Sequence, residues 1–343
     1  TKERYFYMKA FISAARGTVF DTFFPPENIK FAEDLGDIVW FDGKKKPTAS
    51  EVADQIGDCD VYVSLWGSPR VDADIITAAP RLRLHTHLCG TVVPVTSDAE
   101  WDAGIRVISG NDYFARSVAE GTVAYMLTAL RDIPRFYGEL KNEKKWKHSA
   151  DYYTEGLWGR TVGIVSFGAI GHHLAEYLRP FGAKLLIYDI VKIPDETLAR
   201  YGARQASLEE IFSTADVITV HTPLFDETEH LVDVRLISMI KPGALFVNTS
   251  RGKIVDEAAL CRELSDGRFR AFLDVFEKEP PLPESPLYTL PNVFIMPHMA
   301  GPTVDLRKMI AHDLLIESAG YIDRGEPLPH EITRARAARM SVR

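Results

Sequence analysis

Cysteine is scarce in this chain, and the few cysteines present form no metal-binding pattern. The 343 residues include three, Cys59, Cys89 and Cys261, with no C-x-x-C spacing and an odd count. This usage suits a reducing compartment and speaks against a structural zinc site. We therefore expect a cytoplasmic protein that holds no metal.

Long apolar runs and an excess of positive charge are also lacking. No run of 18 or more apolar residues occurs, so we expect no membrane span, and the first residues contain no signal-peptide pattern. Lys and Arg total 40 against 48 Asp and Glu, a net charge of −8. We therefore expect neither a membrane nor a nucleic acid as a partner.

Two local clusters of positive charge stand out against this acidic background. Lys141, Lys144, Lys145 and Lys147 lie in a polar segment, and we interpret them as a solvated face. The arginine-rich end, residues 334–343, is short, and we expect a frayed, solvated tail there. Neither cluster predicts a binding site.

Short apolar runs alternate with helical stretches along the whole chain. The length predicts about two domains, and the hydrophobic content of 46 % is enough for full cores. Strands that alternate with helices predict parallel sheets covered on both faces. We expect strands at residues 5–13, 37–41, 61–65, 82–88, 105–108, 162–165, 184–188, 203–206, 216–221, 244–248, 269–275 and 293–296, and helices at 26–35, 49–56, 71–78, 117–140, 207–213, 231–239, 256–264 and 303–321.

A stretch in the middle of the chain has the order strand, turn, helix, strand. The first strand, Val162–Val165, leads into a turn with Gly168 and Gly171 three residues apart. A helical stretch follows, and the second strand, Lys184–Tyr188, ends directly before Asp189. Glycines in the turn and an acid after the second strand are the layout of a dinucleotide-binding βαβ unit.

Each part of this unit has a physical role in binding a dinucleotide. Free N–H groups at the start of the helix attract the pyrophosphate. Gly168 would let the backbone approach it closely, and Gly171 would let the helix pack on the strand. Asp189 would accept hydrogen bonds from ribose hydroxyls and repel a 2′-phosphate, which favours NAD over NADP. The expected cofactor contacts of the unit are Ser166, Gly168, Ala169, Ile170, Gly171 and Asp189.

The turn departs from the usual fingerprint at its first position. Ser166 stands where the first glycine would be, so the motif is S-x-G-x-x-G. That glycine serves the tight turn, and serine can replace it if its φ is negative. Two alternatives remain open: an ordinary βαβ unit whose glycines only pack, and a protein that binds the cofactor poorly through Ser166.

Three polar side chains follow the ends of later strands. Arg251 lies in FVNTSRG, Glu279 in DVFEKEPP and His298 in MPHMAG, each after an expected strand. In open α/β sheets the ligand crevice lies at the carboxyl ends of the strands, so the three could face one cleft. Glu277 is an equal candidate to Glu279 on local pattern alone.

In several strings of residues, the chain resembles the D-isomer-specific 2-hydroxyacid dehydrogenase family. The similar strings are VGIVSFGAIG, HTPLFDETEHLV, FVNTSRGKIVDEAAL, LDVFEKEPP and MPHMAG, in family order. With the strand pattern, the resemblance implies an α/β fold of two doubly wound parallel-sheet domains with a cleft between them. We expect a discontinuous, flavodoxin-like substrate domain at residues 1–115 plus 310–343, and a Rossmann NAD-binding domain at residues 116–309.

The resemblance also implies the chemistry. Arg251 would bind the substrate carboxylate and polarise the 2-keto oxygen, since a planar guanidinium suits bidentate binding. His298 would be the acid for keto reduction and the base for hydroxy-acid oxidation. The family acid directly precedes a proline, so Glu279 rather than Glu277 would pair with His298. The remaining expected contacts are Thr222, Pro223, Thr249 and Asp274 with the cofactor, and Cys89, Gly90 and Thr91 with the substrate carboxylate.

The expected function is therefore hydride transfer between NAD(H) and a small D-2-hydroxy acid or 2-keto acid. The alternative is an NAD(H)-responsive corepressor-type binding protein on the same fold. Relatives use the region that matches the apolar segment Ser117–Leu140 to form a homodimer, and we expect a homodimer here. Trp66 and Ser68 stand where phosphoglycerate-type relatives have arginines, which disfavours a phosphorylated substrate. The sequence leaves open which acid is used and the direction of the reaction.

Overall fold

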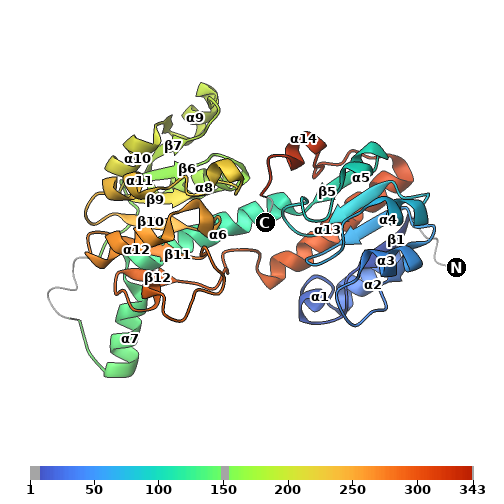
Figure 1. Ribbon diagram of the computed structural model, residues 1–343, viewed down its shortest axis with the longest axis horizontal. Helices are drawn as coiled ribbons and strands as arrows, with labels where there is room; N and C mark the ends of the chain where they lie inside the picture. Colours follow the sequence, from blue (N-terminus) through green and yellow to red (C-terminus); the bar gives the residue numbers. More distant parts are fainter. Residues whose placement is uncertain (1–7, 148–153, 342–343) are drawn as a thin grey trace. The chain divides into compact units, whose positions relative to one another are not determined.

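The computed structural model describes residues 8–147 and 154–341 (Figure 1). The chain divides into two compact units, which we call unit 1 (residues 1–114 with 302–343) and unit 2 (residues 115–301). The long helix α13 (Val304–Arg324) lies wholly in unit 1, where Ile310 and Leu314 are fully buried in the core. The chain therefore returns to unit 1 at Pro302, earlier than the expected boundary near residue 310.

Unit 1 contains a five-stranded sheet in which every pair of neighbouring strands is parallel. The strand order is β2-β1-β3-β4-β5. The two faces are covered differently, because Ile12 packs into a core with α13 while its neighbour Phe11 packs with residues of α3 and α4. The strands are β1 (Met8–Ser13), β2 (Gly36–Trp40), β3 (Val61–Ser64), β4 (Leu84–His87) and β5 (Arg106–Ser109), and the helices are α1 (Thr18–Phe23), α2 (Pro26–Leu35), α3 (Ala49–Ile56), α4 (Ala73–Ala78), α5 (Asp98–Asp102), α13 and α14 (Arg334–Ala337).

Unit 2 contains a seven-stranded sheet, again parallel throughout. Its order is β12-β11-β10-β9-β6-β7-β8, with β6 beside both β9 and β7. The strands are β6 (Thr161–Val165), β7 (Lys184–Tyr188), β8 (Ala203–Gln205), β9 (Val217–Val220), β10 (Leu245–Asn248), β11 (Arg270–Leu273) and β12 (Val293–Ile295). The helices are α7 (Ile133–Glu143), α8 (Ala169–Leu178), α9 (Asp195–Tyr201), α10 (Leu208–Thr214), α11 (Val234–Met239) and α12 (Glu257–Ser265), and α6 (Asn111–Leu130) begins in unit 1 and continues here.

Two parallel-sheet α/β units confirm the expected fold class, and most strands lie within two residues of their expected positions. Helix α3 begins as its sequence predicts, because the Thr48 side chain accepts from the Glu51 N–H while the Glu51 carboxylate accepts from the Thr48 N–H. The Asp256 side chain caps α12 by accepting from Ala259 N–H at 2.8 Å. Residues 5–7 of the first expected strand lie outside the described residues.

The prediction of one long helix at residues 117–140 was wrong in detail. The structure has two helices, α6 and α7, separated where Asp132 takes a left-handed conformation with φ 52°. Pro134 in the first turn of α7 favours a new helix start at this point. Figure 1 shows α7 extending away from the sheet of unit 2.

The arginine-rich end is also ordered rather than frayed over its described part. Thr333 caps α14, and Arg334 forms ion pairs with Asp98 and Asp102 of unit 1. Ala337 is buried, so the segment packs into the same unit. The expectation of a solvated tail missed these acidic partners, because they lie far away in the sequence.

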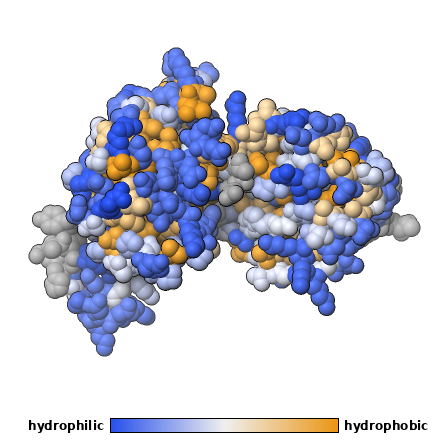
Figure 2. Space-filling model, viewed as in Figure 1, coloured by the Kyte–Doolittle hydropathy of each residue, from blue (hydrophilic) through white to orange (hydrophobic). Residues whose placement is uncertain are grey.

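Figure 2 shows hydrophilic residues mixed with small hydrophobic patches on the visible face of each unit, as is usual for protein surfaces. Among the described residues, no helix is long and apolar enough to cross a bilayer. The same residues include no group of three or more side chains that could hold a metal ion.

Candidate active site

The glycine-containing turn lies where the strand order of unit 2 reverses. Ser166 follows β6 and Thr222 follows its neighbour β9, and their hydroxyl oxygens lie 2.7 Å apart. Ligands of doubly wound sheets bind outside the carboxyl ends of the strands at this kind of position. Because all seven strands are parallel, the other expected site residues of unit 2 follow strand ends at the same edge of the sheet.

The two glycines have different surroundings. A Cβ on Gly171 would lie 2.8 Å from the Ser166 carbonyl oxygen, so Gly171 is required for packing α8 against the turn. A Cβ on Gly168 would meet nothing within 4 Å, so packing does not explain this glycine. An open position directly before the helix fits a ligand that approaches the backbone closely, which favours a binding turn over a merely packed one.

The start of α8 has amides available for an anion. Gly168 is the N-cap without a side-chain cap, and its carbonyl accepts the first helical hydrogen bond from His172 N–H at 3.0 Å. The amides of Ala169 and Ile170 precede that first bond and therefore have no acceptor within the helix. A pyrophosphate would satisfy them.

Ser166 does not meet the condition of a negative φ under which serine could replace the glycine. Its φ is 75°, in the left-handed region that glycine prefers. Two contacts hold the serine in this conformation: its N–H donates to the Tyr188 carbonyl at 2.8 Å, and its hydroxyl contacts Thr222. The turn therefore keeps the conformation for which glycine is usual, at a cost that these contacts offset.

Asp189 lies at the end of β7, where it organises the same turn. One carboxylate oxygen accepts from Phe167 N–H at 2.8 Å and the other from Val191 N–H at 3.1 Å. Each oxygen keeps further lone pairs, so the side chain can still accept from a ribose hydroxyl. Asp189 thus fits the expected role while also fixing the position of Phe167.

Arg251 is presented by a short helical turn after β10. Its Nη1 donates to the Ser250 carbonyl at 2.7 Å, and its own carbonyl accepts from the Asn248 amide at 3.1 Å. Burial lowers the pKa of Arg251, whereas the charge of Glu279 opposes that shift. The Arg251 guanidinium therefore interacts electrostatically with the carboxylate of Glu279, another of the three expected catalytic residues.

The residue after Arg251 explains how this turn is held. A Cβ on Gly252 would lie 1.8 Å from the Phe276 carbonyl carbon and 2.3 Å from the Glu277 nitrogen. Only glycine permits this approach between the turn after β10 and the segment after β11. Sequence reasoning missed Gly252, although its place in the string TSRGK is a signal of close backbone approach.

Glu279, rather than Glu277, contacts His298. Glu279 Oε2 lies 2.9 Å from His298 Nδ1, and Glu279 Oε1 accepts from Phe276 N–H at 3.2 Å. Glu277 Oε1 instead lies 2.9 Å from His230 Nε2. Both members of the Glu279–His298 pair are exposed, at 40 % and 47 % of their side-chain surface, so a small molecule can reach the ring.

Asp274 is buried behind His298 and holds the segment that follows it. Its carboxylate accepts from Met299 N–H at 2.8 Å and Ala300 N–H at 3.0 Å, while its backbone carbonyl accepts from His298 N–H. Tyr125 of α6 donates to the same carboxylate at 3.1 Å, a contact that sequence reasoning missed. Burial and Asp274 together raise the pKa of Tyr125, which keeps its phenol protonated.

The remaining expected cofactor contacts of unit 2 are largely buried. The Thr249 hydroxyl lies 3.0 Å from that of Thr122 on α6. Thr222 and Thr249 are each 5 % exposed, and Pro223 follows Thr222 at the end of β9. Their side chains therefore shape the turns at this edge of the sheet.

A pocket of about 520 Å³ lies beside the Glu279–His298 pair. Both members of the pair line it, and the rest of its wall is mainly apolar. An apolar pocket with a few polar groups is typical of small-molecule sites. The apolar lining comprises Phe276, Pro280, Pro281, Tyr288, Ile295, Met296 and Pro297.

The segment expected to bind the substrate carboxylate lies in unit 1, after β4. In the described structure no hydrogen bond uses the backbone N–H groups of Cys89, Gly90 and Thr91. The Gly90 carbonyl accepts from the Ser109 hydroxyl at 3.1 Å, and the Thr91 hydroxyl donates to the Ser341 carbonyl at 2.9 Å. The segment is thus fixed while its amides stay free for an anion.

Known proteins resemble this chain in sequence and in fold. Residues 123–300 match the model "D-isomer specific 2-hydroxyacid dehydrogenase, NAD binding domain". A glyoxylate reductase of Korarchaeum cryptofilum is 31 % identical over 300 residues, covering 86 % of this chain and 89 % of that protein. A D-3-phosphoglycerate dehydrogenase of Mycobacterium bovis is 32 % identical over 308 residues, covering 90 % of this chain but only 57 % of that protein.

The likeness extends to solved structures. D-lactate dehydrogenase from Aquifex aeolicus, complexed with NAD and lactic acid, is 26 % identical with a TM-score of 0.68, and the match covers 92 % of this chain and 95 % of that one. This chain spans little more than half the length of the D-3-phosphoglycerate dehydrogenases that it matches.

Proposed function

Since the chain belongs to the D-isomer-specific 2-hydroxyacid dehydrogenase family, we propose that it transfers hydride between NAD(H) and a small D-2-hydroxy acid or 2-keto acid. The observation that supports this best is the 2.9 Å contact between Glu279 and an exposed His298. It lies at the same sheet edge as a turn with an open glycine and free amides.

The cofactor would be held by the turn after β6. The amides of Ala169 and Ile170 would bind the pyrophosphate, Gly168 would allow its close approach, and Asp189 would bind the adenosine ribose. When bound, NAD(H) supplies or accepts the hydride at the nicotinamide ring. The carboxylate of Asp189 disfavours a phosphorylated ribose, so we propose NAD rather than NADP.

The protein's own groups would handle charge and proton. Arg251 would bind the substrate carboxylate and polarise the 2-keto oxygen, a role that a planar, delocalised cation performs well. His298 Nε2 would give a proton to that oxygen in reduction and remove it in oxidation. Glu279, in contact with Nδ1, would fix the orientation of the ring.

A turnover assay with NADH and a panel of 2-keto acids tests the proposal. The panel should include glyoxylate, pyruvate and a phosphorylated keto acid, and we expect the phosphorylated acid to be poor. His298→Gln should lower kcat by ~10²–10⁴ while NADH binding stays, because only proton transfer is lost. Arg251→Ala should harm both KM and kcat.

Two outcomes would contradict this function. NADH binding without reduction of any keto acid would favour the corepressor-type alternative. Full activity of His298→Gln would remove the histidine from the mechanism.

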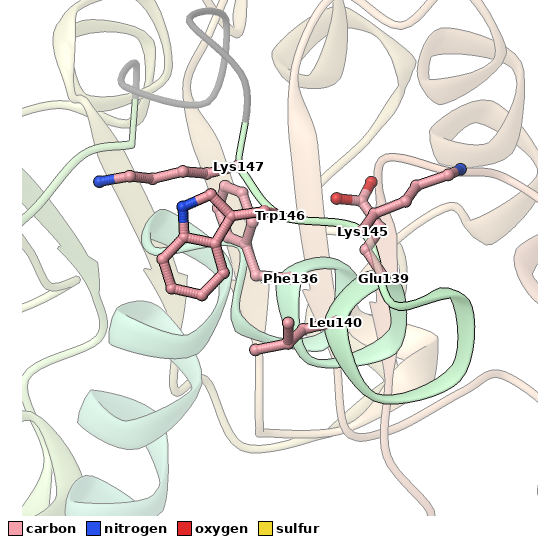
Figure 3. Close-up of a pocket in the computed structure, with 6 residues that line it drawn as sticks. All are labelled: Phe136, Glu139, Leu140, Lys145, Trp146 and Lys147. Atoms are coloured by element: carbon pink, nitrogen blue, oxygen red, sulfur yellow. The ribbon is translucent and has the colours of Figure 1, made fainter.

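We also propose that the protein is a homodimer that uses α7. None of the residues of this helix is buried, and two of its large apolar residues are exposed, Tyr137 at 65 % and Leu140 at 52 %. Leu140 lines a small hollow together with Phe136 of the same helix and Trp146, which follows the helix and is 71 % exposed (Figure 3). Large exposed apolar residues gathered in one segment favour contact with a partner.

A further inference from the structure

Unit 1 contains a chain of buried polar side chains that leads to the expected carboxylate-binding segment. Glu100 of α5 lies 2.7 Å from His85 Nδ1, and His85 Nε2 lies 2.6 Å from the Ser64 hydroxyl. The same hydroxyl lies 2.7 Å from His87 Nδ1. All four side chains are at most 3 % exposed. Buried polar groups are costly, so a continuous line of them needs an explanation.

The chain ends at the backbone of the segment after β4. A hydrogen bond with the Thr91 backbone raises the pKa of His87, although burial and the neighbouring His85 lower it overall to about 3. A bond that favours the protonated ring is one in which the ring donates, so its acceptor is the Thr91 carbonyl. Because Nδ1 already contacts the Ser64 hydroxyl at 2.7 Å, we assign this bond to Nε2, so that neutral His87 carries its one proton there.

This fixed end sets the direction of every bond before it. His87 Nδ1 has no proton and must accept from the Ser64 hydroxyl. Ser64 must then accept from His85 Nε2–H. His85 Nδ1 and Glu100 Oε1 consequently share one proton across their 2.7 Å contact. The other oxygen, Glu100 Oε2, has no hydrogen-bond partner among the described residues.

We propose that Glu100, His85, Ser64 and His87 form a positioning relay that holds the Thr91 carbonyl and thereby aims the amides of Cys89–Thr91 at the substrate carboxylate. This inference rests on the proposed function, because it assigns the carboxylate to that segment. None of the four side chains can touch the substrate, since all are buried. Their effect is on the direction of the amides, and thus on substrate affinity.

Ser64→Ala is the most direct test, because it removes the central link with the smallest change in volume. His87 would then lose its donor to Nδ1 and could move its proton there, which frees the Thr91 carbonyl. The amides bind the carboxylate equally in ground and transition states, so KM for the keto acid should rise about tenfold, as for one lost charge-assisted bond, with kcat and the KM for NADH within about twofold.

Ser13→Ala is the matched control. Ser13 is the register partner of Ser64 on β1 and is 1 % exposed, and its hydroxyl accepts from Tyr62 rather than from the relay. It should lower stability as Ser64→Ala does without changing KM. Equal KM values for the two variants would overturn the proposal.

Two substitutions of Glu100 provide a second test, in which the conservative variant should retain the wild-type KM. The amide of Glu100→Gln can donate to His85 Nδ1 and so preserve the contact that starts the relay, and this variant should keep KM within about twofold. Glu100→Leu cannot donate and should raise KM as Ser64→Ala does. A larger KM increase for Gln than for Leu would overturn the proton assignment.

The relay can also be tested by a measurement that does not depend on enzyme activity. Imidazole ¹⁵N shifts should show His87 protonated on Nε2 in the wild type and on Nδ1 in Ser64→Ala, with the Gly90 and Thr91 amide signals shifted. If the wild type turns over no keto acid yet His87 changes tautomer, the proposed function fails and the relay stands. If His87 keeps the same tautomer in both proteins, the relay fails whatever the activity.

Discussion

At the scale of residues, the notable feature is that two carboxylates two positions apart pair with different histidines. Glu279 contacts His298, whereas Glu277 contacts His230 and also accepts from Glu257 N–H at 3.1 Å. A carboxylate bound to one ring nitrogen fixes the orientation of the imidazole. Glu279→Gln should therefore lower kcat in both directions, although by less than His298→Gln does, because the acid itself remains. Steady-state kinetics in both directions measure this.

Glu277→Gln is the control and should keep wild-type kinetics, because Glu277 contacts His230 instead. A loss of kcat with Glu277→Gln and none with Glu279→Gln would show that the wrong acid was chosen. Wild-type kinetics in both variants would show that the histidine works without a carboxylate partner.

The sequence predicted which residues lie at the carboxyl ends of the strands of unit 2, but not which of these residues contact one another. The family pattern chose Glu279 over Glu277, a choice that local sequence left open. The conformation of Ser166 was not predictable, because the Thr222 hydroxyl that helps to hold it lies far along the chain. The bond from Tyr125 to Asp274 joins α6 to the end of β11, and no local pattern reports such a contact.

At the scale of elements, the candidate site depends on the close approach of two turns. A Cβ on Gly252 would overlap the backbone of Phe276, so Gly252→Ala should force the turn with Arg251 away from the segment with Glu279. We expect a loss of about 1–3 kcal/mol in stability from overpacking. We also expect kcat/KM to fall ~10²-fold, because a displacement of about 1 Å can cost that much.

Gly156→Ala is the control, since its added Cβ would meet only an Arg131 guanidinium nitrogen at 3.8 Å. Urea unfolding and steady-state kinetics of both variants provide the measurement. Gly252→Ala with wild-type kinetics would mean that the spacing of the two turns does not matter for Arg251.

Strands and long helices were predictable because their own residues determine them, whereas short helices depend on distant partners. Apolar runs located β6 and β9, and the proline at its first position located the start of α2. The four-residue α14 is held by Asp98 and Asp102, more than 200 positions earlier. Its arginines alone predict a solvated tail, so only the folded unit reveals the element.

At the scale of the whole molecule, the proposed homodimer depends on α7 and the residues directly after it. Leu140 lies on α7, which has no buried residue, and Trp146 follows the end of this helix; both are large, apolar and exposed. Burying such side chains against a second copy would stabilise a dimer by about 1.5–3 kcal/mol each. Leu140→Glu with Trp146→Glu should therefore convert a dimer into a monomer in sedimentation velocity at micromolar concentration.

Val234→Glu is the matched control for that dimer. Val234 is 50 % exposed and lies on α11, a different helix of the same unit from the one that carries Leu140. The variant should therefore sediment as the wild type does. A monomeric wild type would contradict the proposed assembly outright. A dimer that survives both charges on α7 would show that the two copies meet through another surface, because a buried glutamate without a partner is too costly for the interface to tolerate.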